Sequence, residues 1–175
     1  MYKSKTNKLK LYLVVIFSGL LLTGCGIYSF TGGNVGDAKT LQIDYFRNEA
    51  SLIEPTLSQL FTQELQDLFT TQTNLTLVNA NADLHFEGEI VGYEITPMSA
   101  TGNDLQTAAQ NRLTVTINVR FTNKLKEEDD FEKRFSFYSD FDATEQLVGS
   151  ILDTALEEIN DRITQDIFNA SVAKW

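Results

Sequence analysis

Cys25 is the only cysteine among the 175 residues, so its thiol is the one candidate for thiol chemistry. A disulfide needs a second thiol, so none can form within this chain. The G-x-S-x-G turn that presents the nucleophile of many serine hydrolases is absent from the sequence. Cys25 is therefore the candidate for covalent modification, and its neighbours decide which modification.

Metal ligands of the usual kinds are scarce. His85 is the only histidine, which excludes an H-E-x-x-H zinc motif, and a three-histidine site would need three chains. On an alternating strand we expect His85 to be a surface or edge residue. Residues 127–130 are consecutive acids, whereas an EF-hand loop needs alternating acids, a glycine and a terminal glutamate. We interpret this run as a solvated hairpin tip and expect no metal or cofactor.

Paired carboxylates are the remaining catalytic arrangement. Asp83, Glu87, Glu89 and Glu94 lie along predicted strands, but the carboxylate separation that glycoside hydrolysis needs is a property of the fold. Because no other pattern pairs a nucleophile with a base, we expect no enzymatic activity and assign no catalytic residue.

The segment that ends at Cys25 indicates export and lipid attachment. Four lysines precede an apolar run at residues 11–22, which is too short for a spanning helix of about 20 residues. Leu22-Thr23-Gly24-Cys25 resembles the lipobox of bacterial lipoproteins, in which the cysteine takes a diacylglycerol and the chain is cleaved before it. We expect residues 1–24 to be a removed signal peptide and residues 25–38 a lipidated tether.

The residue after Cys25 bears on the membrane that holds the protein. Gly26 stands where an acidic residue often retains lipoproteins at the inner membrane. By that resemblance we expect an outer-membrane lipoprotein on the periplasmic side. Each buried methylene contributes about 0.8 kcal/mol, so two or three acyl chains make a near-permanent anchor.

The chain without its signal would hold 151 residues, enough for one domain with a sizeable core. It would carry ten basic and 24 acidic residues, a formal net charge of −14. This charge argues against binding nucleic acid or lying on an anionic lipid surface, because both need clustered lysine and arginine.

Periodicity then defines the elements of a single domain at residues 39–175. Alternating apolar residues predict strands at residues 40–46, 75–78, 83–96, 113–122 and 131–141. The register of the third strand changes near Gly88 and Gly92, which predicts a bulge. Helical spacing begins after Pro55 and again at Asp142, where D-A-T-E resembles a capping box. Residues 97–111 have no clear period and predict a long functional loop.

This order of elements predicts an α+β two-layer sandwich. Two helices would cover one face of a mostly antiparallel or mixed four- to five-stranded sheet. The other sheet face would be more polar and open to a partner.

Three stretches together resemble the LptE family of lipopolysaccharide-assembly lipoproteins, in its Bacteroidetes-type form. They are C-G-I-Y-S-F at residues 25–30, A-A-Q-N-R-L-T-V at residues 108–115, and D-I-F-N at residues 166–169 near Trp175. The likeness covers nearly the whole chain, and none of the stretches is a catalytic motif.

The resemblance implies a non-enzymatic subunit that plugs the outer-membrane barrel LptD, supports its assembly and assists delivery of lipopolysaccharide. Some family members contact lipopolysaccharide phosphates through basic side chains. Arg112 and Arg120 share one strand face and are the candidates here for contact with the partner or with lipopolysaccharide, although the acidity of the chain argues against direct lipopolysaccharide binding. The alternative is a periplasmic lipoprotein that binds a small molecule or peptidoglycan, with residues 97–111 closing over a pocket.

Overall fold

The computed structural model describes residues 35–98 and 109–172, and their elements belong to one compact unit. The expected signal peptide, the lipidation at Cys25 and most of the tether lie outside the described residues. So does most of the connection predicted at residues 97–111.

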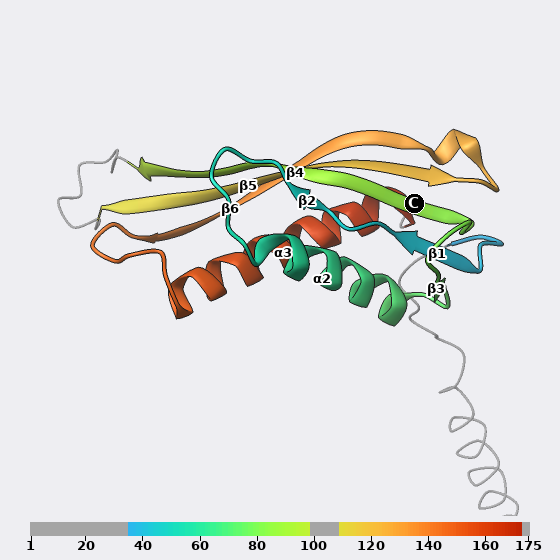
Figure 1. Ribbon diagram of the computed structural model, residues 1–175, viewed down its shortest axis with the longest axis horizontal. Coiled ribbons are helices and arrows are strands. Elements are labelled where there is room, and N and C mark those ends of the chain that lie inside the picture. Colours follow the sequence, from blue (N-terminus) through green and yellow to red (C-terminus); the bar gives the residue numbers. More distant parts are fainter. Residues whose placement is uncertain (1–34, 99–108, 173–175) are drawn as a thin grey trace, which may run out of the picture. The chain divides into compact units, whose positions relative to one another are not determined.

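A mixed sheet forms one layer of the domain (Figure 1). Within the described residues it has six strands, in the order β3-β1-β4-β5-β6, with β2 paired to β4 beyond β1. The three short strands pair in parallel, and β4, β5 and β6 form an antiparallel meander. The strands are β1 (Thr40–Ile43), β2 (Arg47–Asn48), β3 (Thr76–Leu77), β4 (Leu84–Met98), β5 (Gln110–Asn123) and β6 (Phe131–Asp142).

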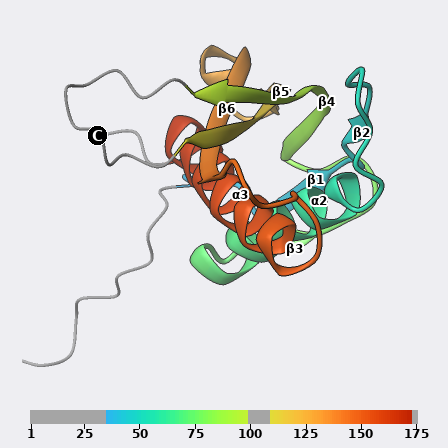
Figure 2. The same cartoon turned by 90° about the vertical axis from the view of Figure 1, so that its left-hand side faces the viewer.

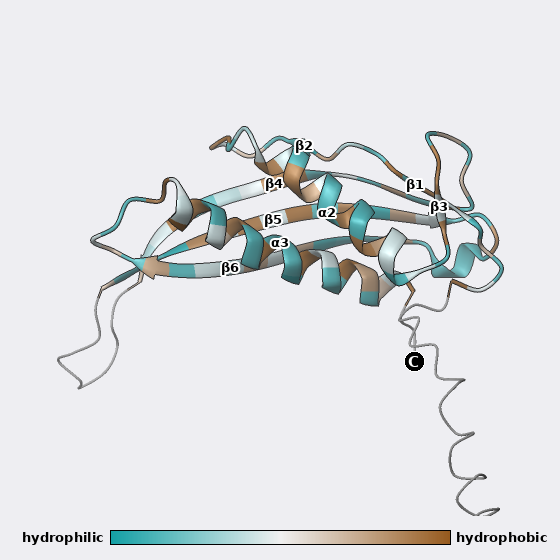
Figure 3. Ribbon diagram, turned by 90° about the horizontal axis from the view of Figure 1, so that it is seen from below, coloured by the Kyte–Doolittle hydropathy of each residue, from teal (hydrophilic) through white to brown (hydrophobic). Residues whose placement is uncertain are grey.

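Two helices, α2 (Leu57–Gln72) and α3 (Ser150–Ser171), form the second layer. They lie side by side on the same face of the sheet (Figure 2). Seen from the helix side, α2 lies nearer β4 and α3 nearer β6 (Figure 3). The predicted α+β sandwich is confirmed, with one strand more than expected because β2 is a separate short strand.

The core between the layers is organised by aromatic rings. Phe86 of β4 lies 4.9 Å from Phe69 of α2 and 4.6 Å from Phe121 of β5, measured between ring centroids. Phe69 also contacts Phe168 of α3 at 5.0 Å. One ring from each helix therefore meets the sheet in a single cluster, and burial of each such side chain contributes about 1.5–3 kcal/mol.

The first predicted strand is wrong beyond Ile43. Its alternation placed Tyr45 inward, but Tyr45 is 57% exposed and Phe46 is fully buried. Ile43 pairs with Phe86 and Arg47 pairs with Glu89, so four steps along the first strand match three along β4. The extra residue reverses the side-chain alternation, and Arg47, the residue after the predicted strand, begins β2.

The bulge predicted in β4 is confirmed, with a register shift between Ile90 and Gly92. Gly88 has a separate role, because a side-chain carbon there would collide with the carbonyl oxygen of Asn118 and lie 2.6 Å from Phe46 Cε1. The buried Phe46 ring therefore needs glycine at position 88.

The predicted start of the second helix is wrong by eight residues. Asp142 still pairs with Gln110 in the sheet, and its Oδ1 accepts hydrogen bonds from the backbone and hydroxyl of Thr144. The D-A-T-E stretch is therefore a turn closed by an aspartate side chain. The helix begins only after Gly149, whose φ of +56° favours glycine.

The ends of the predicted 97–111 loop belong to strands. Pro97 pairs with Asn111 and Met98 with Gln110, so β4 and β5 are longer than their apolar alternation indicates. Pairing with the neighbouring strand extends them past the last buried residue.

Candidate functional site

The sheet face opposite the helices carries the polar groups that could meet a partner. Residues of β5 alternate strictly, so its odd-numbered apolar residues from Leu113 to Phe121 are buried and its even-numbered ones point outward. The outward side chains bond to residues directly across on β4 and β6. We call this surface the outward sheet face, defined by the side chains of residues 87, 89, 112, 116, 118, 120, 134, 136, 138 and 140.

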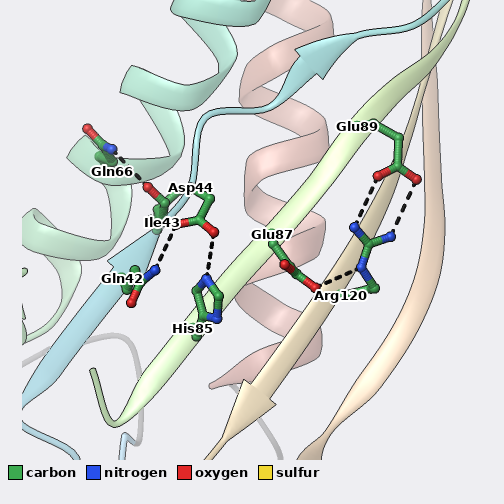
Figure 4. A network of polar contacts seen from close by, with 8 residues as sticks. All are labelled: Gln42, Ile43, Asp44, Gln66, His85, Glu87, Glu89 and Arg120. Carbon is green, nitrogen blue, oxygen red and sulfur yellow. Dashed lines mark hydrogen bonds and ion pairs between the residues drawn. The ribbon is translucent and has the colours of Figure 1, made fainter. Parts of the chain in front are cut away.

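Arg120 is bound by two carboxylates of β4 (Figure 4). Its Nε donates to Glu87 Oε1 at 2.9 Å, and its Nη2 donates to Glu89 Oε2 at 3.2 Å. The hydrogen bonds that Arg120 donates to Glu87 and Glu89 raise the pKa of Arg120 above its usual range. A hydrogen bond from Asn118, together with Arg120, lowers the pKa of Glu89 despite its partial burial. Arg120 and Glu89 are therefore charged at neutral pH.

Arg112 forms a second ion pair, near the other end of the same face. Its Nε and Nη2 donate to the two oxygens of Asp140 at 2.7 and 2.8 Å, a bidentate geometry. Its guanidinium carbon lies 3.5 Å from the centroid of the Tyr138 ring. The bond from Arg112 lowers the pKa of Asp140. Arg112 is thus held flat on an aromatic ring by an ionised partner.

Between the two arginines, hydroxyl and amide groups and a third arginine continue the pattern. The hydroxyls of Thr116 and Ser136 lie 2.9 Å apart, and Arg134 donates to Asn118 Oδ1 at 3.1 Å. Both contacts join residues directly opposite in the β5–β6 register. Five of the six charged side chains on the outward sheet face are therefore in ion pairs across neighbouring strands, and the sixth, Arg134, bonds to an amide.

The structure places the two predicted arginines on one face, as expected, but in separate clusters. Sequence reasoning missed their partners Glu87, Glu89 and Asp140. These partners lie about 30 residues away along the chain and become neighbours only through strand register. One sequence signal could have indicated the partners of Arg120. Acidic residues alternate along the predicted strand at residues 83–96, which could pair with the strand that carries Arg120.

His85 is half-buried on the same face of β4. Its Nε2 lies 2.9 Å from Asp44 Oδ2, and Gln42 Nε2 donates to Asp44 Oδ1 at 2.8 Å (Figure 4). Burial is the largest single effect on Asp44 and raises its pKa, but the bonds from Gln42 and His85 together outweigh it and lower the pKa. Asp44 is therefore ionised at neutral pH.

The expected lipidation site, Cys25, lies outside the described residues. Among the helices that the structure describes, none is both long and apolar enough to cross a membrane.

The fold and this surface define a small α+β domain that presents a self-paired polar sheet face, the class of a binding or assembly module. More particularly, the chain belongs to the LptE family of lipopolysaccharide-assembly proteins, whose model matches residues 38–171. That family is one of non-enzymatic assembly lipoproteins, and this chain is of that lipopolysaccharide-assembly kind.

Solved structures similar to this chain share low identity with it. A hypothetical protein from Chlamydia trachomatis has 10% identity and a TM-score of 0.49, covering 74% of this chain and 93% of that one. Lipoprotein B from Nitrosomonas europaea has 15% identity and a TM-score of 0.40, covering 73% and 82%. The rare lipoprotein B from Shewanella oneidensis has 13% identity and a TM-score of 0.37, covering 72% and 92%. No curated protein matches this chain.

Proposed function

We propose that this protein is an outer-membrane lipoprotein, on the periplasmic side, that plugs the LptD β-barrel. In that place it supports assembly of the barrel and assists passage of lipopolysaccharide to the outer leaflet. The family match over residues 38–171 carries the proposal. The outward sheet face supports it, because two of its three arginines are already paired with carboxylates, so a partner could enclose them without leaving these charges unpaired.

The anchor of this protein would be Cys25. The lipobox at residues 22–25 motivates this assignment. Metabolic labelling of cells with a palmitate analogue should mark the wild-type chain and not a Cys25→Ser variant, which should also keep its signal peptide. Equal labelling of the two chains would contradict the assignment.

Arg112 and Arg120 remain the candidate contacts for the barrel or for lipopolysaccharide. All three nitrogens of Arg120 bond to Glu87 or Glu89, whereas Arg112 bonds to Asp140 through two of its three nitrogens. Arg112 therefore keeps more capacity to donate to a partner. A phosphate at Arg120 would also stand beside the carboxylates of Glu87 and Glu89, which would repel it.

Site-specific photocrosslinking in cells tests this surface. A crosslinking residue at position 112 or 120 should give adducts with LptD, and one at exposed Glu157 on α3 reports on the helix layer. Absence of barrel adducts at all three positions would count against the proposal, whereas adducts at position 157 alone would move the interface to the helices.

A hollow of about 350 Å³ bears on the alternative, a small-molecule or peptidoglycan binder. It is lined by residues such as Leu84, Phe121 and Val172, at the opposite end of β4 and β5 from residues 97–111. The hollow is therefore remote from Met98 and Gln110, the paired residues on either side of that loop. A ligand-dependent rise in melting temperature without any barrel would favour the alternative.

A further inference from the structure

Two carboxylates and the imidazole of His85 converge next to Arg120. Asp44, His85 and Glu87 each offer one ligand atom, and these atoms all lie within 4.8 Å of one another. We propose that this trio binds one divalent transition-metal ion of the zinc type. The inference concerns the isolated chain and does not depend on a barrel partner.

Strand pairing builds the trio. β1 and β4 run parallel, with Gln42 opposite His85, and the pairing continues one step further because the Asp44 amide donates to the Phe86 carbonyl. Residues two apart on a strand share a face. Gln42 and Asp44 on one strand therefore stand beside His85 and Glu87 on the next, and Figure 4 shows these side chains together.

Each carboxylate of the trio is held by a neighbour outside it. Gln42 donates to Oδ1 of Asp44, and Arg120 donates to Oε1 of Glu87. Asp44 Oδ2 faces His85, and Glu87 Oε2 makes no hydrogen bond or ion pair within the described part of the chain. Outer partners that orient ligands in this way are a regular feature of metal sites.

The charge of the cluster also favours a cation. Arg120 bonds to both Glu87 and Glu89, and Asp44 adds a third carboxylate beside His85. One guanidinium does not offset three carboxylates, so the group carries net negative charge. A divalent ion would offset this charge without any change in the fold.

The donor set selects the kind of ion. One imidazole nitrogen with two carboxylate oxygens suits Zn²⁺ and similar transition ions, whereas Mg²⁺ and Ca²⁺ prefer oxygen ligands alone. The ion would replace the proton now shared between His85 Nε2 and Asp44. If the His85 ring is neutral, this proton moves from Nε2 to Nδ1. If the ring is an imidazolium, the proton is released to water. Partial exposure leaves room for water ligands.

The single histidine makes the test direct. The full chain in detergent, free of LptD, is titrated with Zn²⁺ while the ¹⁵N-labelled imidazole of His85 is followed by NMR. We expect a saturable shift of Nε2 at one ion per chain, and no such shift with Mg²⁺. An imidazole signal that stays unchanged at saturating Zn²⁺ would overturn the proposal, whatever else the acidic surface binds.

Variants test the oxygen ligands and their support. Asp44→Asn and Glu87→Gln should each weaken Zn²⁺ binding at His85 by about tenfold or more, and Gln42→Ala by about 10- to 100-fold. Glu127→Gln, an exposed acid in the β5–β6 turn, is the matched control and should bind as the wild type does. If both carboxylate variants bind Zn²⁺ with wild-type affinity, His85 alone binds the ion and the proposed three-residue site is refuted.

Discussion

Glu64 illustrates how an acidic chain tolerates carboxylates within its helix layer. It lies half-buried on α2, where burial and the charges of Asp161, Glu157 and Asp67 raise its pKa to about 7. A folded-state pKa above the ordinary value means that protonation stabilises the fold. This contribution is complete below about pH 4.5 and is lost as the pH rises through about 7.

Replacement of Glu64 should therefore have a pH-dependent effect. Glu64→Gln should raise the melting temperature at pH 8 by about 2–4 °C, a value that discounts for solvent exposure. At pH 5 the change should be small, because the native carboxyl is already protonated. Exposed Glu145→Gln serves as the control in melts followed by circular dichroism. The same increase at both pH values would contradict this explanation.

At Gly88, close contacts with backbone and with a buried ring require glycine. Gly88→Ala should lower the free energy of unfolding by about 1–3 kcal/mol or more, because backbone and the buried Phe46 ring block the added methyl group. Gly92→Ala is the matched control on the same strand, since its nearest neighbour is a side-chain atom of Thr116 at 3.0 Å. Urea unfolding should show the larger loss at position 88, and equal losses would argue against the steric account.

At the scale of elements, α2 depends on one buried face. Phe69 joins this helix to Phe86 of the sheet and Phe168 of α3. Phe69→Ala should therefore cost about 3–5 kcal/mol. Leu60→Ala on the same helix is the control and should change stability by less than about 0.5 kcal/mol, because Leu60 is 45% exposed. Denaturant unfolding of both variants compares them, and similar losses would show that the Phe69 cluster is not central.

The elements with strong periodicity were the ones predictable from sequence. The alternation from Leu113 to Phe121 marked β5 and its buried face, and the glycines near residue 90 marked the bulge in β4. Tyr45 and Phe46 were assigned to the wrong faces because the extra residue there depends on pairing with a distant strand. The turn at Asp142 was likewise decided by its partner Gln110, which a local capping pattern cannot reveal.

The outward sheet face shows the same limit at the site. Composition and alternation could place Arg112 and Arg120 on one polar face, but their ionised partners come from register. The same holds for Asp44, which reaches His85 only through the parallel pairing of β1 with β4. Contacts between side chains on different strands depend on strand order and register, and the sequence predicted these only in part.

At the scale of the whole molecule, the family match over residues 38–171 makes this chain a protein of the lipopolysaccharide-assembly kind. The expected lipid at Cys25 would hold the domain at the membrane, and a net charge of −14 for the chain without its signal would keep the domain soluble around that anchor. A compact domain of this kind can be enclosed by a larger partner without further folding.

Copurification tests the central claim most directly. The tagged, lipidated chain is extracted from membranes in gentle detergent and isolated beside an unrelated tagged outer-membrane lipoprotein. We expect LptD to be recovered with this chain and not with the control. Repeated isolation of the intact lipoprotein without any large β-barrel would contradict its assignment as the LptD partner.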